Sequence, residues 1–360
     1  VIIAVRLLSR CQKRWPTAPI VATSFADANT KREMNSNCST ISSMLTALSL
    51  VLVLCLSRSS FGEAKTATKT RPLYEKHKNL CRGLPKLSKK HENDLQKFFK
   101  EIGETKVVGQ TTQNEAVCWM LRQGRGYESQ RYALAVTYYS SKGAQWDTNT
   151  NWMTPKHECS WYGVTCNAFR TVVELDLGYI ELEGLVPREM ALLTKLRDLD
   201  LHGNDLQGVI PHRMLIGLSK IEYLRLQMNG LFGSIHKEIA RMKNLKELYL
   251  FGNFFAGTIP KQISELKKLE IIDLYANQLE GTIPKELAKL PNLKYLDLHD
   301  NNLTGRMPKE ICDMKLETLI ADCHGPMPEV KCDCCTVCCE GLPVLACFDP
   351  KTGQQVSRAL

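Results

Sequence analysis

The feature that most constrains the fold is a self-similar segment of about 24 residues that recurs along the second half of the chain. Five copies are regular, and they begin at Leu196, Ile221, Leu245, Leu269 and Leu293. A degenerate copy begins at Val172, and a half copy begins at Leu316. One unit of this size cannot bury its apolar side alone, so the units are predicted to stack into a solenoid with a continuous core.

Each copy is predicted to form a strand, a turn and an extended return. The LxxLxL core alternates apolar and polar residues, which predicts a short strand with one buried face. An asparagine follows where the chain must turn, and its buried amide can satisfy backbone groups of its own turn and of the next coil. The asparagines are Asn204, Asn229, Asn253, Asn277 and Asn301. The fold class is therefore predicted to be α/β, with one continuous parallel sheet.

These repeats resemble the plant-type leucine-rich repeat, LxxLxLxxNxLxGxIPxxLxxLxx. The segment "ECSWYGVTC" at 158–166, preceded by Trp146 and Trp152, resembles the N-terminal cap of that family. The resemblance covers about residues 128–325, and the layout is similar to extracellular leucine-rich repeat proteins of microalgae. It implies a curved right-handed superhelix with a parallel β-sheet on its concave face, a helical N-terminal cap and a cysteine-rich C-terminal cap.

The chain is predicted to divide into five segments. In order they are a mis-started leader with a signal peptide at 1–64, a basic arm with one helix at 65–110, the helical cap at 111–171, about six and a half repeats at 172–325, and the cysteine-rich cap and tail at 326–360.

The apolar run "MLTALSLVLVLCL" at 44–56 is shorter than the ~20 residues that a membrane span needs. It has the length of the apolar region of a signal peptide, which predicts a secreted or cell-surface protein. The alternative is a single-pass membrane protein anchored by residues 41–61.

The net charge of +9 is unevenly distributed along the chain. Residues 65–110 carry 12 Lys/Arg against 5 Asp/Glu, whereas residues 111–360 carry 28 against 30. Since the large repeat region is slightly acidic, we expect no nucleic-acid partner.

Residues 65–360 hold 12 of the 15 cysteines, and an even number in a secreted chain favours disulfides. The resemblance implies that Cys159 and Cys166 pair in the N-terminal cap. The pairing at the other end stays open, and its cysteines are Cys312, Cys323, Cys332, Cys334, Cys335, Cys338, Cys339 and Cys347. A zinc cluster and redox-active or lipid-modified thiols are the alternatives there, but we expect no metal.

The strand side chains that point away from the core are predicted to form columns on the concave face, with ~4.8 Å between neighbours. Aromatic residues collect in the middle of this face and carboxylates flank them, which is typical of a recognition surface. The alternative is that the rings only pack on one another. The predicted ligand-binding residues are Tyr223, Arg225, Tyr249, Phe251, Asp273, Tyr275, Tyr295 and Asp297.

Stacked carboxylates such as Asp176 and Asp200 are predicted to lie roughly 5 Å apart, near the separation found in retaining glycosidases. An open sheet cannot exclude water or raise the pKa of one carboxylate by burial, so we expect no enzyme and no cofactor.

The predicted function is non-catalytic recognition of an extracellular protein, peptide or glycan, as in receptor ectodomains or cell-wall-enzyme inhibitors. The alternative is a structural or adhesive protein of the wall or matrix. Asn302 begins an N-glycosylation acceptor, "NLT", on the turn side of a repeat.

Overall fold

The structure is a computed structural model of the 360-residue chain. It describes residues 81, 89, 93, 94, 97, 98, 100, 112–123, 128–325, 328–340 and 346–356, all of which lie in one compact unit, Thr70–Leu360. The predicted signal peptide or anchor and most of the basic arm lie outside these residues, and the five-segment division stays a prediction. Within the described residues, no helix is long and apolar enough to cross a membrane.

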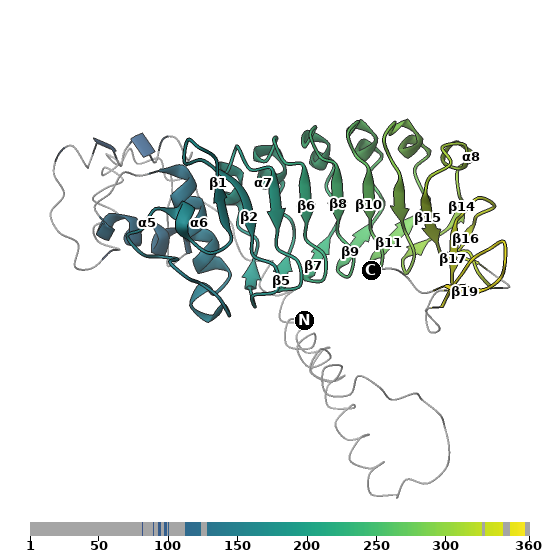
Figure 1. Ribbon diagram of the computed structural model, residues 1–360, viewed down its shortest axis with the longest axis horizontal. Helices are drawn as coiled ribbons and strands as arrows, with labels where there is room; N and C mark the ends of the chain where they lie inside the picture. Colours follow the sequence, from purple (N-terminus) through teal and green to yellow (C-terminus); the bar gives the residue numbers. More distant parts are fainter. Residues whose placement is uncertain are drawn as a thin grey trace, which may run out of the picture. The chain divides into compact units, whose positions relative to one another are not determined.

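Among the described residues, eleven strands form one large sheet that runs along the repeats (Figure 1). In spatial order they are β1 (Val164–Cys166), β2 (Val172–Asp176), β4 (Asp198–Asp200), β6 (Tyr223–Arg225), β8 (Glu247–Tyr249), β10 (Ile271–Asp273), β12 (Tyr295–Asp297), β15 (Thr318–Ala321), β17 (Val337–Cys339), β18 (Cys347–Phe348) and β19 (Gln355–Val356). The strands from β2 to β17 are parallel, whereas β1, β18 and β19 are antiparallel additions at the ends.

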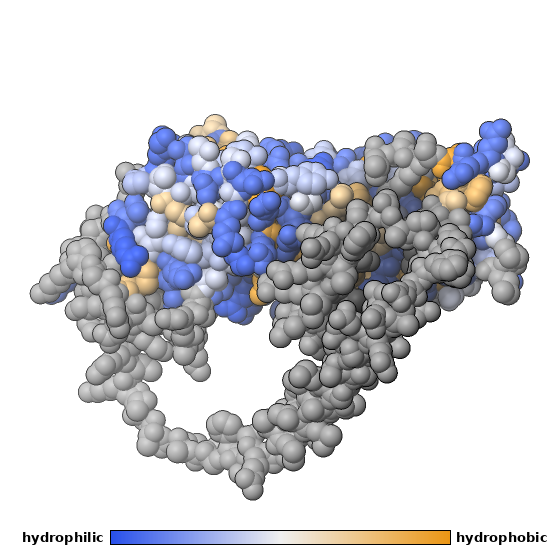
Figure 2. All heavy atoms as spheres, turned by 90° about the horizontal axis from the view of Figure 1, so that it is seen from below, coloured by the Kyte–Doolittle hydropathy of each residue, from blue (hydrophilic) through white to orange (hydrophobic). Residues whose placement is uncertain are grey.

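A second parallel sheet, which the sequence analysis did not predict, follows the turn of each repeat. Its strands are β3 (Glu183–Leu185), β5 (Asp205–Gly208), β7 (Gly230–Gly233), β9 (Phe254–Gly257), β11 (Gln278–Gly281) and β13 (Asn302–Leu303). These strands lie below the large sheet in Figure 1, and Figure 2 views the molecule from that side. Hydrophobic residues are scattered among hydrophilic ones on the visible part of this side. Three residues of the second sheet are more than half exposed to solvent: Leu185, Phe232 and Phe254.

Short helical turns close each coil opposite the second sheet (Figure 1). They are η3 (Arg188–Leu192), α7 (His212–Gly217), η4 (Lys237–Arg241), η5 (Lys261–Glu265), η6 (Lys285–Lys289) and α8 (Lys309–Cys312). A short strand pair, β14 (Gly305–Arg306) and β16 (Val330–Lys331), joins the last coil to the C-terminal segment.

The regular spacing of leucines along the repeats places them in one continuous core. Leu199 pairs with Leu175 on one side and Leu224 on the other, and all three are completely buried. The predicted asparagine ladder is also present. Asn229 Nδ2 donates to the carbonyls of Leu226 and Gln227 in its own turn and to Leu201, while its Oδ1 accepts the Leu206 N–H. The asparagine side chain therefore bonds to the preceding coil, and the prediction that it bonds to the next coil is wrong.

Helices cover the N-terminal end of the solenoid. They are α5 (Thr112–Gln123) and α6 (Ser129–Ser140), which pack against each other, followed by the short turns η1 (Gly143–Gln145) and η2 (Glu158–Ser160). The indole rings of Trp146, Trp152 and Trp161 contact in sequence at centroid distances of 4.9 and 5.0 Å. Disulfides join Cys159 to Cys166 and Cys81 to Cys118. These contacts shield the leucines of the first coil from water.

Disulfides fasten the C-terminal end. Their pairs are Cys312–Cys334, Cys323–Cys338, Cys332–Cys335 and Cys339–Cys347. The sulfurs of Cys323, Cys332 and Cys335 lie within 4.8 Å of one another, but each belongs to a disulfide and so is not a free thiolate for a metal. The predicted solenoid, with helices at one end and disulfides at the other, is confirmed.

Candidate functional site

The concave face consists of the side chains of the large sheet, from β2 to β15, that point away from the core. Register places residues of successive repeats side by side on it. Arg225 pairs with Tyr249, Tyr249 with Asp273, and Asp273 with Asp297. The eight predicted ligand-binding residues thus lie on the four adjacent strands β6, β8, β10 and β12, or within two residues of a strand end.

The aromatic residues in the middle of this face contact one another. The rings of Phe251 and Tyr275 lie 5.9 Å apart, and Tyr275 stacks on His299 at 4.3 Å. Tyr223 lies beneath two cations, with Arg225 Cζ at 5.2 Å and Lys246 Nζ at 5.6 Å from its ring centre. The rings therefore pack along the sheet, as the alternative held. They nevertheless stay partly exposed, which leaves ring surface for a ligand.

Arg225 is held in place by carboxylates on both sides. Its guanidinium donates to both oxygens of Asp198, at 2.8 and 3.0 Å, and to Glu247 at 3.2 Å. Burial raises the pKa of Asp198, the hydrogen bond from Arg225 lowers it, and the neighbouring carboxylates of Asp200 and Asp176 raise it further. Burial likewise raises the pKa of Tyr249. This part of the face is thus a closed ion-pair network with an excess of negative charge.

Two of the predicted ligand-binding residues, Asp273 and Asp297, are buried in the sheet, with only 3% and 0% of their surfaces accessible to solvent. Asp297 accepts hydrogen bonds from the Tyr295 hydroxyl at 3.2 Å and from the His299 N–H at 3.2 Å, and its Oδ1 lies 2.5 Å from His299 Nδ1. Asp273 accepts the Tyr275 N–H at 3.3 Å. Both carboxylates are thus buried and bonded within the protein, and their role in ligand binding stays a prediction.

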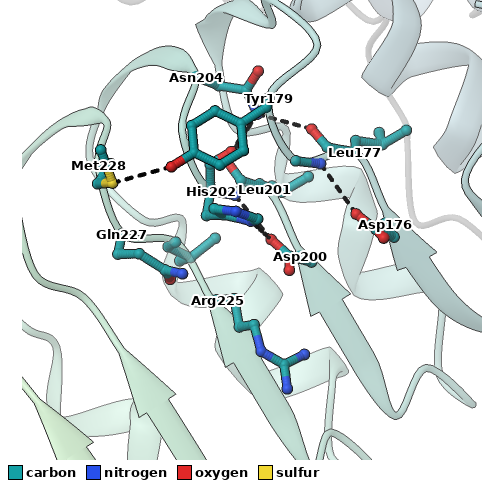
Figure 3. Close-up of polar contacts among 12 residues, drawn as sticks. Asp176, Leu177, Tyr179, Asp200, Leu201, His202, Asn204, Arg225, Gln227 and Met228 are labelled. Carbon is teal, nitrogen blue, oxygen red and sulfur yellow. Dashed lines mark hydrogen bonds and ion pairs between the residues drawn. The ribbon is translucent and has the colours of Figure 1, made fainter. Parts of the chain in front are cut away.

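A second group of side chains, outside the eight predicted ligand-binding residues, lies at the N-terminal end of the concave face (Figure 3). His202 Nδ1 lies 2.5 Å from Asp200 Oδ1, and the His202 ring meets the Tyr179 ring edge to face at 4.6 Å. The Tyr179 hydroxyl reaches Met228 Sδ at 3.4 Å. We call Asp176, Asp200, His202, Tyr179, Gln227 and Met228 the amino-end cluster.

Two glycines make the amino-end cluster possible. A Cβ on Gly178 would lie 2.6 Å from the His202 ring, and a Cβ on Gly203 would overlap the Tyr179 ring. Each ring therefore occupies the space that a side chain would fill at the neighbouring glycine. The alternation of apolar and polar residues correctly predicted that Asp176 and Asp200 are neighbours, but the direction of the Tyr179 ring has no signal in the repeat pattern.

A pocket of about 610 Å³ lies between α6 and the first coil. Its lining includes Glu128, His157, Arg170 and Lys195. Ligand atoms of Glu128, His157 and Glu158 lie within 4.8 Å of one another, as in a metal site. Glu158, however, is already bonded to Arg131 at 2.8 Å and to Gln130 at 2.8 Å. A cation there would have to displace Arg131, so we assign this carboxylate to the structure of the cap.

Comparisons with known proteins agree with the repeat pattern. Residues 243–303 match the family model of the leucine-rich repeat. Probable LRR receptor-like serine/threonine-protein kinase RPK1 of Arabidopsis thaliana is 40% identical over 101 residues, which cover 22% of this chain and 18% of that protein. Phytosulfokine receptor 1 of Arabidopsis thaliana is 34% identical over 83 residues, which cover 22% of this chain and 8% of that protein. This chain thus spans less than a fifth of the length of either relative.

Among solved structures, the ectodomain of the Arabidopsis receptor kinase HAESA, in complex with an N-terminally extended IDA peptide hormone, is 34% identical in sequence. The superposition covers 45% of this chain and 28% of that chain, with a TM-score of 0.43.

Proposed function

We propose that this plant-type leucine-rich repeat protein, similar to receptor ectodomains, recognises an extracellular ligand on its concave face and has no catalytic role. The observation that supports this proposal is the set of partly exposed aromatic rings on adjacent strands, bordered by the Arg225 carboxylate network. Amphipathic rings held by a rigid sheet offer a large contact area at a small cost in conformational entropy. The curated relatives are receptor-like proteins, which supports the same class of function.

We infer that the ligand is a protein or peptide, with a glycan as the alternative. Tyr and Phe rings can cover apolar side chains, and the carboxylates can pair with lysine or arginine. Whether the protein acts as a receptor or as an inhibitor depends on the partner that it meets.

A secreted or cell-surface location accompanies this proposal. The six disulfides of the described residues are typical of proteins that fold in an oxidising compartment. Asn302 is exposed on β13, so its side chain is accessible to glycosylation.

The experiment is a protein, peptide and glycan array screened with the full chain purified from culture medium. We expect binding to one ligand class, and we expect Tyr275→Ala to weaken that binding at least tenfold through lost ring contact. The structural or adhesive alternative predicts a different result. Binding would then survive Tyr275→Ala, would depend steeply on salt, and would be reproduced by a peptide of residues 65–110.

A further inference from the structure

The amino-end cluster offers hydrogen-bond acceptors close together. Asp176 pairs in register with Asp200, and Asp200 with Arg225, so the carboxylates lie on neighbouring strands. Asp176 is exposed and accepts the Gly178 N–H at 3.2 Å, while Asp200 accepts the His202 N–H at 3.0 Å. The Arg225 cation beside them is engaged by Asp198 and Glu247. Within the cluster, His202 lies against Asp200 and can offset at most one of the two carboxylate charges. The cluster therefore keeps an excess of negative charge.

A separate observation concerns Gln227, which follows β6 on the next coil. Its residue surface is only 8% exposed, and its Oε1 has no hydrogen-bond partner. In Figure 3 its amide extends toward the side of the cluster where Asp200 and Arg225 lie. Burying an acceptor without a donor destabilises the fold, because its lost hydrogen bond to water is not replaced. A donor supplied from outside the chain would recover that energy.

The same cluster has an apolar wall. Tyr179 and Met228 are 59% and 47% exposed, although they contact each other and Tyr179 also contacts His202. An aromatic ring and a thioether suit the aliphatic stem of a long cationic side chain. The hard cations Ca²⁺ and Mg²⁺ instead take oxygen ligands and gain nothing from such a wall.

We propose that the amino-end cluster is a subsite for an arginine or lysine side chain of a peptide or protein ligand. The aliphatic stem lies against Tyr179 and Met228, the cationic head is placed between Asp176 and Asp200, and one of its N–H groups donates to Gln227 Oε1. This assignment rests on the proposed function and adds the chemistry of one ligand residue to it. Arginine fits better than lysine because its fork of donors can reach three acceptors at once.

The test is titration calorimetry of the full chain with acetylated, amidated tetra-arginine, and with tetra-glutamine as the uncharged probe. We expect tetra-arginine to bind and tetra-glutamine not to bind. Asp176→Asn and Asp200→Asn should each weaken tetra-arginine binding about tenfold, the loss of one charge-assisted hydrogen bond. Glu280→Gln removes an exposed carboxylate from β11 in the second sheet and should leave the affinity unchanged.

Substitutions of Gln227 distinguish binding at a specific subsite from general attraction of tetra-arginine to negative charge. Gln227→Glu should tighten tetra-arginine binding, and Gln227→Met should weaken it about threefold without lowering the melting temperature, because an apolar replacement leaves no unpaired acceptor. Three results would each overturn the assignment. The first is an equal effect of Asp176→Asn and Glu280→Gln on the affinity for tetra-arginine, and the second is an unchanged affinity in Gln227→Glu. The third is displacement of tetra-arginine by millimolar Ca²⁺.

Failure of this subsite is distinguishable from failure of the proposed function. If the two Asn variants bind tetra-arginine normally while Tyr275→Ala loses the array ligand, only the subsite is wrong. If Tyr275→Ala keeps the array ligand while the Asn variants lose tetra-arginine, the subsite holds and the aromatic surface is not the recognition site.

Discussion

The carboxylate of Asp322 accepts the backbone N–H of Asp300 at 3.0 Å, and its other oxygen accepts that of Asn301 at 3.4 Å. One repeat earlier, the equivalent N–H groups of Ala276 and Asn277 donate to backbone carbonyls of the following coil. Asp322 thus substitutes a side chain for the coil that is missing at the end of the array. Burial raises the pKa of this carboxyl to about 6, although the two backbone bonds oppose the rise.

The raised pKa of Asp322 predicts a pH dependence of stability. Between pH 6 and pH 4 the folded chain binds a proton at Asp322 that the unfolded chain, with a pKa near 3.8, does not bind. This group therefore makes folding more favourable as the pH falls from 7 toward 4, by about 2 kcal/mol. Urea unfolding at pH 7 and pH 5 measures this change in the free energy of unfolding. The wild type should gain stability relative to Asp322→Asn at the lower pH, and parallel curves for the two proteins would show that burial does not perturb this carboxyl.

The asparagine side-chain bonds predict a large difference in stability between substitutions of two nearby asparagines, Asn253 and Asn244. Asn253 donates to three carbonyls and accepts the Leu231 N–H at 3.1 Å, all within the core. Asn253→Ala leaves these groups without partners, and we expect a loss of about 2–4 kcal/mol in the free energy of unfolding. Asn244, which bonds the Ser219 carbonyl at the surface, is the matched control, and Asn244→Ala should cost less than about 1 kcal/mol. Equal losses would contradict the ladder.

The cap depends on a buried ion pair. Arg131 contacts the rings of Trp119 and Trp161 and donates to Glu158, of which only 1% is exposed. Arg131→Ala leaves that carboxylate buried without its cation, so thermal unfolding should reveal a loss of about 3–5 kcal/mol.

The control for this prediction is the exposed pair of Arg306 and Asp333, which lie 2.6 Å apart. Arg306→Ala should cost no more than about 1 kcal/mol because water screens the pair. A cap variant as stable as this control would show that Arg131 is dispensable.

Replacing Gly203 with alanine is predicted to displace the Tyr179 ring in the amino-end cluster. The same replacement at Gly252 serves as the control. Gly203 and Gly252 have φ of +65° and +63°, so alanine is strained at both, by about 1 kcal/mol. At Gly252 the nearest atoms to an added Cβ are 3.5 Å away, whereas at Gly203 the Cβ would overlap the Tyr179 ring. A crystal structure of Gly203→Ala should show the Tyr179 hydroxyl away from Met228, and Gly252→Ala should leave that contact intact. An unmoved Tyr179 in the first variant would contradict the packing described here.

Much of the fold follows from the repeat because its signal is carried by local spacing. The alternation around Leu199 fixes one buried strand face, and register then fixes which residues neighbour Arg225. The second sheet was missed because its strands span only two to four residues around a glycine, too short for a period of two to be recognisable. The direction of the asparagine bonds, to the preceding coil, depends on how the coils stack and not on the pattern within one coil.

The candidate site could be predicted less completely. The predicted columns of outward-pointing side chains place Asp297 on the concave face. They contain no information on its hydrogen bonds to Tyr295 and His299. The amino-end cluster depends on Gly178 and Gly203 lacking a side chain, and both glycines lie at positions where the repeat pattern accepts any residue. The pairing of eight cysteines depends on where the last coil ends, and the spacing of cysteines alone does not determine it.

Recognition on the concave face is tested most directly by comparing two phenylalanines that lie three positions apart. Phe251 belongs to the aromatic surface, and Phe254 lies on β9 of the second sheet, where 52% of its surface is exposed. The measurement is the dissociation constant of the strongest array ligand for the wild type, Phe251→Ala and Phe254→Ala. We predict at least a tenfold increase for Phe251→Ala and no change for Phe254→Ala. The opposite order would place recognition on the second sheet and contradict the proposed function.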